Sequence, residues 1–139
     1  MRVGLGMAVD QVLFEHDRKL LIRPLTPLNE VLPAGFIALI PAFGENERTD
    51  GEELMASLLE LGCLHVCCLG PESETLHDSI DWVIEAANQL DVVTTWHDDV
   101  VEGCEYFVHV ASGRAQVLVA FVAERPEVVD TLMNEVRAK

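Results

Sequence analysis

Four runs of mainly apolar and β-branched residues recur along the chain, and each run ends in polar, Gly or Pro residues. They span residues 36–40, 64–69, 92–95 and 116–122. Apolar runs of this length that do not alternate with polar residues are typical of parallel strands covered on both faces. We therefore predict four buried strands.

Helical periodicity fills the segments after each run. The first helix is expected to begin at Thr49, because Glu52 stands three residues further on in a capping-box spacing. The other three are expected over about 72–89, over about 100–111, and from Pro126, a favoured first helical position. The resulting β-α alternation predicts a mostly parallel sheet joined by right-handed crossovers.

The pattern favours an α/β fold in one domain spanning residues 1–139. We expect a three-layer Rossmann-like or flavodoxin-like architecture, with about four strands and helices on both faces. Residues 1–35 do not follow the β-α repeat of residues 36–139. Residues 11–14 and 19–22 are expected to form a hairpin, followed by an extended, proline-rich connection.

Polar side chains follow the predicted strands, and in open α/β sheets ligands bind at the carboxyl ends of the strands. The most informative stretch is Val92–Asp99, where an apolar strand leads directly into Trp96-His97-Asp98-Asp99. The candidate binding site at this edge comprises Glu45, Glu72, His77, Asp78, Trp96, His97, Asp98 and Asp99.

Two interpretations of this cluster stay open. In the first, His97 and Asp98 form a zinc, manganese or magnesium site with one of Glu45, Glu72 or Glu124. In the second, Asp98 or Asp99 caps the third helix, because Asp99 and Glu102 have capping-box spacing. A pair between His77 and the residue four further on, and stacking of Trp96 on a ligand, are further expectations.

The four cysteines form no C-x-x-C pair. We expect reduced, buried thiols, with the adjacent Cys67 and Cys68 on opposite faces of a strand. A zinc site built from Cys63, His65, Cys67 and Cys104 is an alternative, although it lacks the usual ligand spacing. No other cofactor is predicted.

The net charge of −15 is confined to the middle of the chain. Residues 45–105 hold sixteen acids and one base, Arg48, whereas residues 1–44 and 106–139 each hold four acids and four bases. A negative field of this kind repels nucleic acid and anionic membranes and favours a cationic partner, a metal ion or simply solubility. No apolar run is long enough to span a membrane, and no export signal is evident, so we expect a cytoplasmic protein.

Several nucleotide-binding and catalytic motifs are missing from the sequence. Pro41-Ala42-Phe43-Gly44 follows the first predicted strand in place of a G-x-G-x-x-G loop, and there is no Walker-type loop. No serine stands in a nucleophile elbow.

The Gly70-Pro71-Glu72 turn, His77-Asp78 and the string Thr94-Thr95-Trp96-His97-Asp98-Asp99 resemble a family of small uncharacterised bacterial proteins. The resemblance covers residues 36–122 and leaves out the first 35 residues. It implies a soluble bacterial protein and no particular activity.

Two functions compete, and whether the protein is an enzyme stays open. The first is a non-catalytic module, of the immunity or inhibitor kind, that docks a basic protein. The second is a metal-dependent hydrolase or related small enzyme using the His97 and Asp98 cluster. Self-association through the charge-balanced terminal segments is a third hypothesis.

Overall fold

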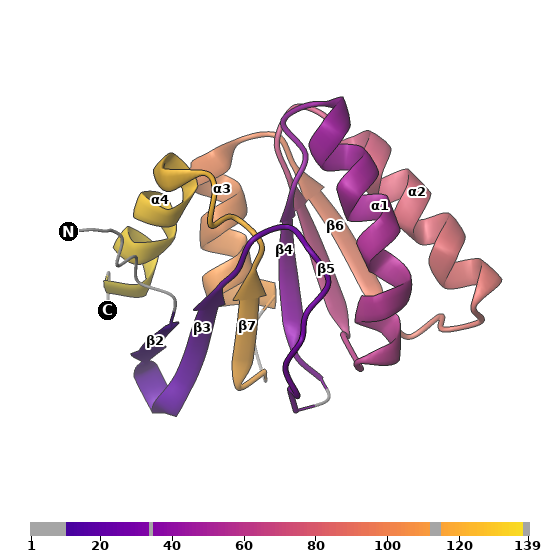
Figure 1. The fold of residues 1–139 in the computed structure, drawn as a ribbon. Helices are drawn as coiled ribbons and strands as arrows, with labels where there is room; N and C mark the ends of the chain where they lie inside the picture. The colour runs from indigo at the N-terminus through magenta and orange to yellow at the C-terminus, as the bar shows by residue number, and fades with distance from the viewer. Residues whose placement is uncertain (1–10, 34, 112–114, 138–139) are drawn as a thin grey trace.

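The structure is a computed structural model that describes residues 11–33, 35–111 and 115–137 (Figure 1). Its strands are β2 (Gln11–Phe14), β3 (Arg18–Ile22), β4 (Ile37–Pro41), β5 (His65–Leu69), β6 (Val93–His97) and β7 (Val117–Ala120). Its helices are α1 (Glu45–Glu60), α2 (Ser73–Ala86), α3 (Val100–Glu105) and α4 (Pro126–Arg137), with a short turn η1 (Glu15–Asp17) and a wide helical turn η2 (Tyr106–Ala111).

All six strands belong to one sheet in the order β2-β3-β7-β4-β5-β6. The four predicted apolar runs are β4, β5, β6 and β7, and all of them pair in parallel, as expected. The predicted N-terminal hairpin is also present, with β2 antiparallel to β3. The sheet has six strands rather than about four because β3 pairs in parallel with β7, so the hairpin extends the same sheet.

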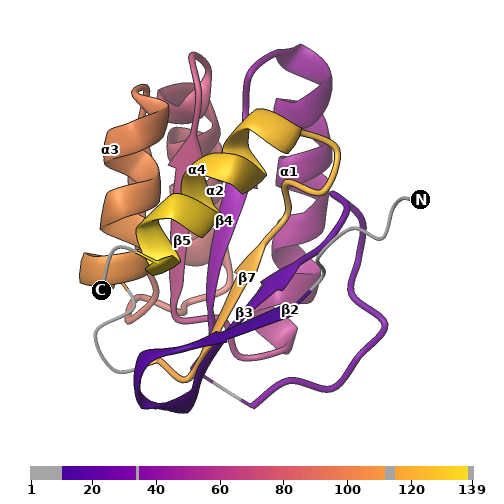
Figure 2. The same cartoon turned by 90° about the vertical axis from the view of Figure 1, so that its left-hand side faces the viewer.

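Helices cover both faces of the sheet (Figures 1 and 2). Side chains of α1 and α2 join one buried apolar cluster, and side chains of α3, η2 and α4 join a second cluster on the other face. The two adjacent cysteines of β5 mark this division, because Cys68 belongs to the first cluster and Cys67 to the second. Their predicted opposite orientation is therefore confirmed.

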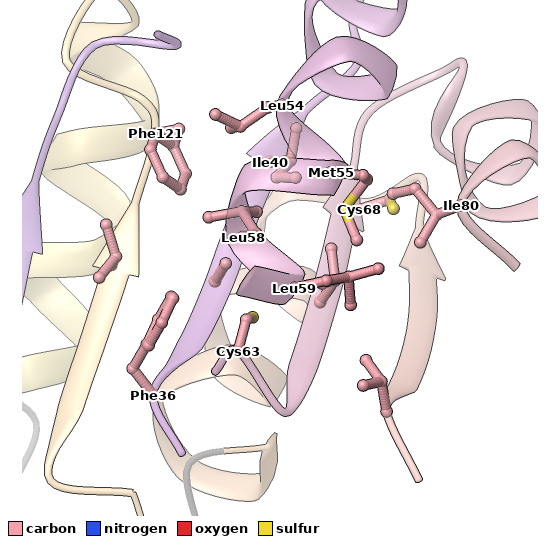
Figure 3. Close-up of a cluster of buried hydrophobic side chains, with 14 of the residues drawn as sticks. Phe36, Ile40, Leu54, Met55, Leu58, Leu59, Cys63, Cys68, Ile80 and Phe121 are labelled. Carbon is pink, nitrogen blue, oxygen red and sulfur yellow. The ribbon is translucent and has the colours of Figure 1, made fainter. Parts of the chain in front are cut away.

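Helix α1 supplies much of the first cluster (Figure 3). Leu54, Met55 and Leu58 are at most 2% exposed and lie among Ile40 of β4 and Phe121 just after β7. Burial of aliphatic and aromatic side chains on this scale is the main favourable term in folding. It fixes α1 over the centre of the sheet.

Helix α1 begins four residues earlier than Thr49, so the predicted capping box at Thr49 and Glu52 is wrong. Gly44 is the residue that precedes the helix, and the Glu47 carboxylate accepts a hydrogen bond from the Phe43 backbone N–H at 2.8 Å. Acidic side chains in the first turn also favour this start, because they interact well with the positive end of the helix dipole.

The predicted third helix is present over the expected residues but is not uniform. Six residues of regular helix, α3, pass into the wider turn η2. Gly103 allows α3 to approach the sheet closely, since a Cβ there would lie 2.4 Å from Leu69 Cδ1 and 3.0 Å from His97 Cβ.

Within the described part of the chain, no helix combines the length and apolar character that crossing a bilayer requires.

Candidate functional site

The carboxyl ends of the parallel strands meet at one edge of the sheet, as the sequence predicted. The Ala42 N–H donates to the Leu69 carbonyl at 2.7 Å, and the Gly70 N–H donates to the His97 carbonyl at 2.9 Å. Gly70 has φ +123°, and a Cβ at this position would lie 2.8 Å from the Ala42 carbonyl oxygen. Glycine is required here because it tolerates positive φ and leaves room for the neighbouring backbone.

An arginine and a glutamate link the ends of β4 and β7. Arg125 Nε donates to Glu47 Oε2 at 2.6 Å, and the Arg125 guanidinium stands over the Phe43 ring at 4.0 Å. The hydrogen bond to Glu47 raises the pKa of Arg125. Glu45, the candidate from this loop, is exposed in the first turn of α1, and no described side chain forms an ion pair with it.

Glu72 lies directly before α2 and faces α1. Its carboxylate accepts a hydrogen bond from Arg48 Nε at 2.9 Å, and Arg48 also binds Glu52 at 3.1 Å. The bond to Glu72 raises the pKa of Arg48. The one base within residues 45–105 is therefore already occupied by two carboxylates.

His77 and Asp78 lie on α2, on the same side of the sheet as Glu72. His77 Nδ1 is 3.1 Å from Asp78 Oδ1, and its Nε2 is 3.5 Å from Asp81 Oδ2, so the predicted i,i+4 pair is present. Asp81 also accepts a hydrogen bond from the Thr94 hydroxyl of β6. These contacts tie α2 to the edge strand.

His97 points to the opposite face of the sheet, beneath η2. Its ring lies 4.7 Å from the Tyr106 ring, and its Nε2 lies 3.2 Å from Thr95 Oγ1. His65 of β5 also meets the Tyr106 ring, edge-on, with the ring centroids 5.7 Å apart. Glu72 and His97 thus share an edge of the sheet through their backbones but send their side chains to different faces.

Burial shifts the pKa values of His65, His97 and Tyr106. Desolvation lowers the pKa of His97, although the charges of Glu102 and Asp98 partly oppose the shift. Desolvation and the nearby His97 lower the pKa of His65, whose Nε2 is buried without a hydrogen-bond partner. Desolvation also raises the pKa of Tyr106. Neutral imidazoles beside a protonated phenol are therefore expected at pH 7.

Three more candidates surround the end of β6. Asp99 precedes α3 and accepts a hydrogen bond from the Glu102 backbone N–H at 3.0 Å, so the helix-cap interpretation is confirmed for Asp99. Asp98 is exposed. Trp96 is 41% exposed, so part of its ring is open to solvent.

Nothing in the described residues gathers into a metal-binding group of three or more His, Cys, Asp or Glu side chains. This applies both to His97 with Asp98 and to the set of Cys63, His65, Cys67 and Cys104. All four cysteines are free and buried, as expected. Burial raises the pKa of Cys67 to about 12, so its thiol is protonated at neutral pH and is a poor nucleophile.

Sequence reasoning missed the group of Thr95, Tyr106 and His65 around His97. Part of this group could have been predicted from the sequence. Residues two apart on a strand share a face, so Thr95 and His97 lie on the same side of the sheet. The pairing of β5 with β6 then adds His65 and Cys67. Tyr106 could not have been found this way, since its position depends on the wide turn η2.

No curated protein matches the chain. A family model described as a domain of unknown function (DUF7684) matches residues 22–132, a wider span than the expected 36–122 that includes the end of β3 and the proline-rich connection. The chain therefore belongs to this family, the domain of unknown function DUF7684.

Proposed function

We propose that this protein is a non-catalytic binding module that docks a basic protein partner, in the manner of an immunity or inhibitor protein. The observation that carries the proposal is the concentration of sixteen acids and one base in residues 45–105. These residues form α1, β5, α2, β6 and α3, so the excess charge belongs to one continuous part of the fold.

The exposure of these acids supports a surface that is open to a partner. The four half-buried acids already have partners, since Glu47 binds Arg125, Glu52 and Glu72 bind Arg48, and Asp81 binds Thr94. The other twelve are exposed: Glu45, Asp50, Glu53, Glu60, Glu74, Asp78, Glu85, Asp91, Asp98, Asp99, Glu102 and Glu105. Such a field accelerates association with cationic proteins and makes it sensitive to salt.

Binding of fluorescent poly-lysine, measured by anisotropy at several salt concentrations, tests the proposal. We expect affinity to fall as ionic strength rises through about 0.15 M, where the Debye length is about 8 Å. Glu85→Gln with Glu105→Gln should weaken binding. Glu124→Gln with Asp130→Asn changes the net charge equally outside the acidic block and should leave binding near the wild-type value. An affinity that does not change with salt concentration, or an equal loss of affinity in both double variants, contradicts the proposal.

The metal-dependent hydrolase has weaker support. The hypothesis needs His97, Asp98 and a further acid to converge, but the His97 ring packs against Tyr106 and Thr95 while Glu72 binds Arg48. Self-association through the charge-balanced segments 1–44 and 106–139 is a separate hypothesis, because it would leave the acidic block exposed. A cytoplasmic location fits the four free cysteines.

We also infer a Rossmann-like architecture in preference to a flavodoxin-like one. Counted from β4, the strand order β6-β5-β4-β7 corresponds to 3-2-1-4, as in the Rossmann order. A flavodoxin-like order would put the third of these strands, β6, beside the first. The two apolar clusters on opposite faces support a three-layer arrangement.

A further inference from the structure

The strand β6 forms one end of the sheet and pairs only with β5 among the described strands. Figure 1 shows it at the margin of the sheet, beside α2 and far from the N-terminal hairpin. Edge strands present unpaired backbone groups that another chain can extend, and proteins usually protect them with Lys, Pro or bulges. The sequence of β6, Val-Thr-Thr-Trp-His, contains none of these protective residues.

The direction of the free backbone groups follows from the bonds to β5. The Val93 N–H donates to the Leu64 carbonyl at 2.9 Å, and the His97 carbonyl accepts from the Gly70 N–H at 2.9 Å. Backbone groups of successive strand residues point to alternate sides in a parallel ladder. The N–H and carbonyl groups of Thr94 and Trp96 therefore point outward, away from β5.

The surroundings of this edge are acidic on both faces of the sheet. Asp78 and Asp81 lie on the α2 side, and Glu102 lies in α3 on the other side. Asp91 and Asp98 lie just before and just after the strand. Apart from Arg48, which binds two carboxylates, residues 45–105 contain no Lys or Arg to neutralise these groups.

The edge also offers apolar contact. Val93 is 49% exposed and Trp96 is 41% exposed, and these two residues face opposite sides of the strand. A second copy of this chain would match the backbone groups but would bring a second set of acids against the first. A cationic strand from another protein would pair with the free backbone groups of β6 and neutralise the flanking acids.

We propose that the β6 edge is the docking site for an extended basic segment of the partner, which adds a strand to the sheet through Thr94 and Trp96. Main-chain hydrogen bonds supply affinity in this mode, and alternate side chains supply specificity. Lys or Arg side chains on both faces of the added strand would meet the flanking acids, and apolar side chains would meet Val93 and Trp96. This inference rests on the function proposed above and names its contact surface.

A peptide that repeats Lys-Lys-Val-Val, labelled with fluorescein, is the probe, because this order places both Lys and Val on each face of a strand. Hydrogen exchange of the free protein should be fast at the Thr94 and Trp96 amides and slow at the Val93 and Thr95 amides, and bound peptide should slow the first pair. The same peptide with N-methyl groups on every backbone nitrogen of its central residues keeps the charge but cannot donate to β6 from either edge. It should bind about tenfold more weakly, the loss expected for one or two backbone hydrogen bonds.

A pair of variants gives an independent measurement. Thr94→Pro removes an outward N–H, which edge strands tolerate, and should weaken peptide binding about tenfold. Thr94→Val removes the hydroxyl but keeps the N–H, and should bind like the wild type. If Thr94→Pro fails to fold by circular dichroism, the N-methyl comparison on wild-type protein still decides the question.

The outcomes separate this inference from the proposed function. Salt-dependent binding with equal affinity for both peptides and no change at Thr94 and Trp96 overturns the edge-strand site and leaves the acidic binding module standing. If poly-lysine binds and the Lys-Val peptide does not, the edge-strand site is also overturned and the acidic binding module still stands. Failure of every cationic probe at low salt overturns both.

Discussion

At the scale of single residues, His65 and His97 differ from surface histidines because burial disfavours their charged forms. Their pKa values are lowered from 6.5, so below pH 6.5 the unfolded chain binds more protons at these positions than the folded chain does. The stability that they contribute is fully present above pH 6.5 and is lost as pH falls through their folded pKa values.

Replacing His65 with Phe should therefore flatten the decline in stability on acidification. The aromatic contact with Tyr106 is kept, while the titrating group is removed. Urea unfolding at several pH values between neutral and mildly acidic checks this expectation. Identical slopes for the wild type and His65→Phe would show that this imidazole does not govern the pH response.

A second prediction concerns Asp99, whose carboxylate caps α3. Asp99→Ala should lower the free energy of unfolding by about 1 kcal/mol, as is typical for loss of an N-cap. Asp98→Ala is the matched control, because Asp98 is exposed and is not the cap, and it should stay within about 0.5 kcal/mol of the wild type. Chemical denaturation measures both. Equal effects would contradict the cap assignment.

At the scale of elements, the close approach of α3 to the sheet depends on Gly103. Alanine normally favours a helix over glycine, but a Cβ here meets Leu69 Cδ1 at 2.4 Å. We expect Gly103→Ala to destabilise the protein by about 1–3 kcal/mol through overpacking. Val101→Ala, at an exposed position of the same helix, should cost less than about 0.5 kcal/mol. A stabilising Gly103→Ala in thermal unfolding would show that α3 can move outward freely.

The ends of elements were predicted less well than their existence. The capping-box spacing at Thr49 resembled a helix start, but the contacts of Glu47 with Phe43 and Arg125 favour a start at Glu45. Arg125 lies 78 positions away in the chain, so no local pattern could reveal its contribution. The cap of α3 was predicted at Asp98 or Asp99 and lies at Asp99, and the sequence could indicate it because the cap interaction is local.

At the scale of the whole molecule, the net charge of −15 opposes the compact state through self-repulsion. Added salt screens this repulsion, so we expect Tm to rise by a few degrees between low salt and about 0.15 M. Glu85→Gln with Glu105→Gln should raise Tm at low salt more than Glu124→Gln with Asp130→Asn. Differential scanning fluorimetry checks both comparisons. A Tm that does not respond to salt would mean that the acids are too widely spaced to repel.

The sequence by itself determined the elements and the sheet class, because apolar periodicity, turn residues and a local cap are properties of neighbouring residues. It also located the acidic block and the edge of the sheet where Gly70 and His97 meet. Only the tertiary structure decided that Glu72 joins Arg48 on one face while His97 joins Tyr106 on the other. Side-chain direction at a strand end depends on strand order and on the helix packed above it, and both arise from contacts between segments far apart in the chain.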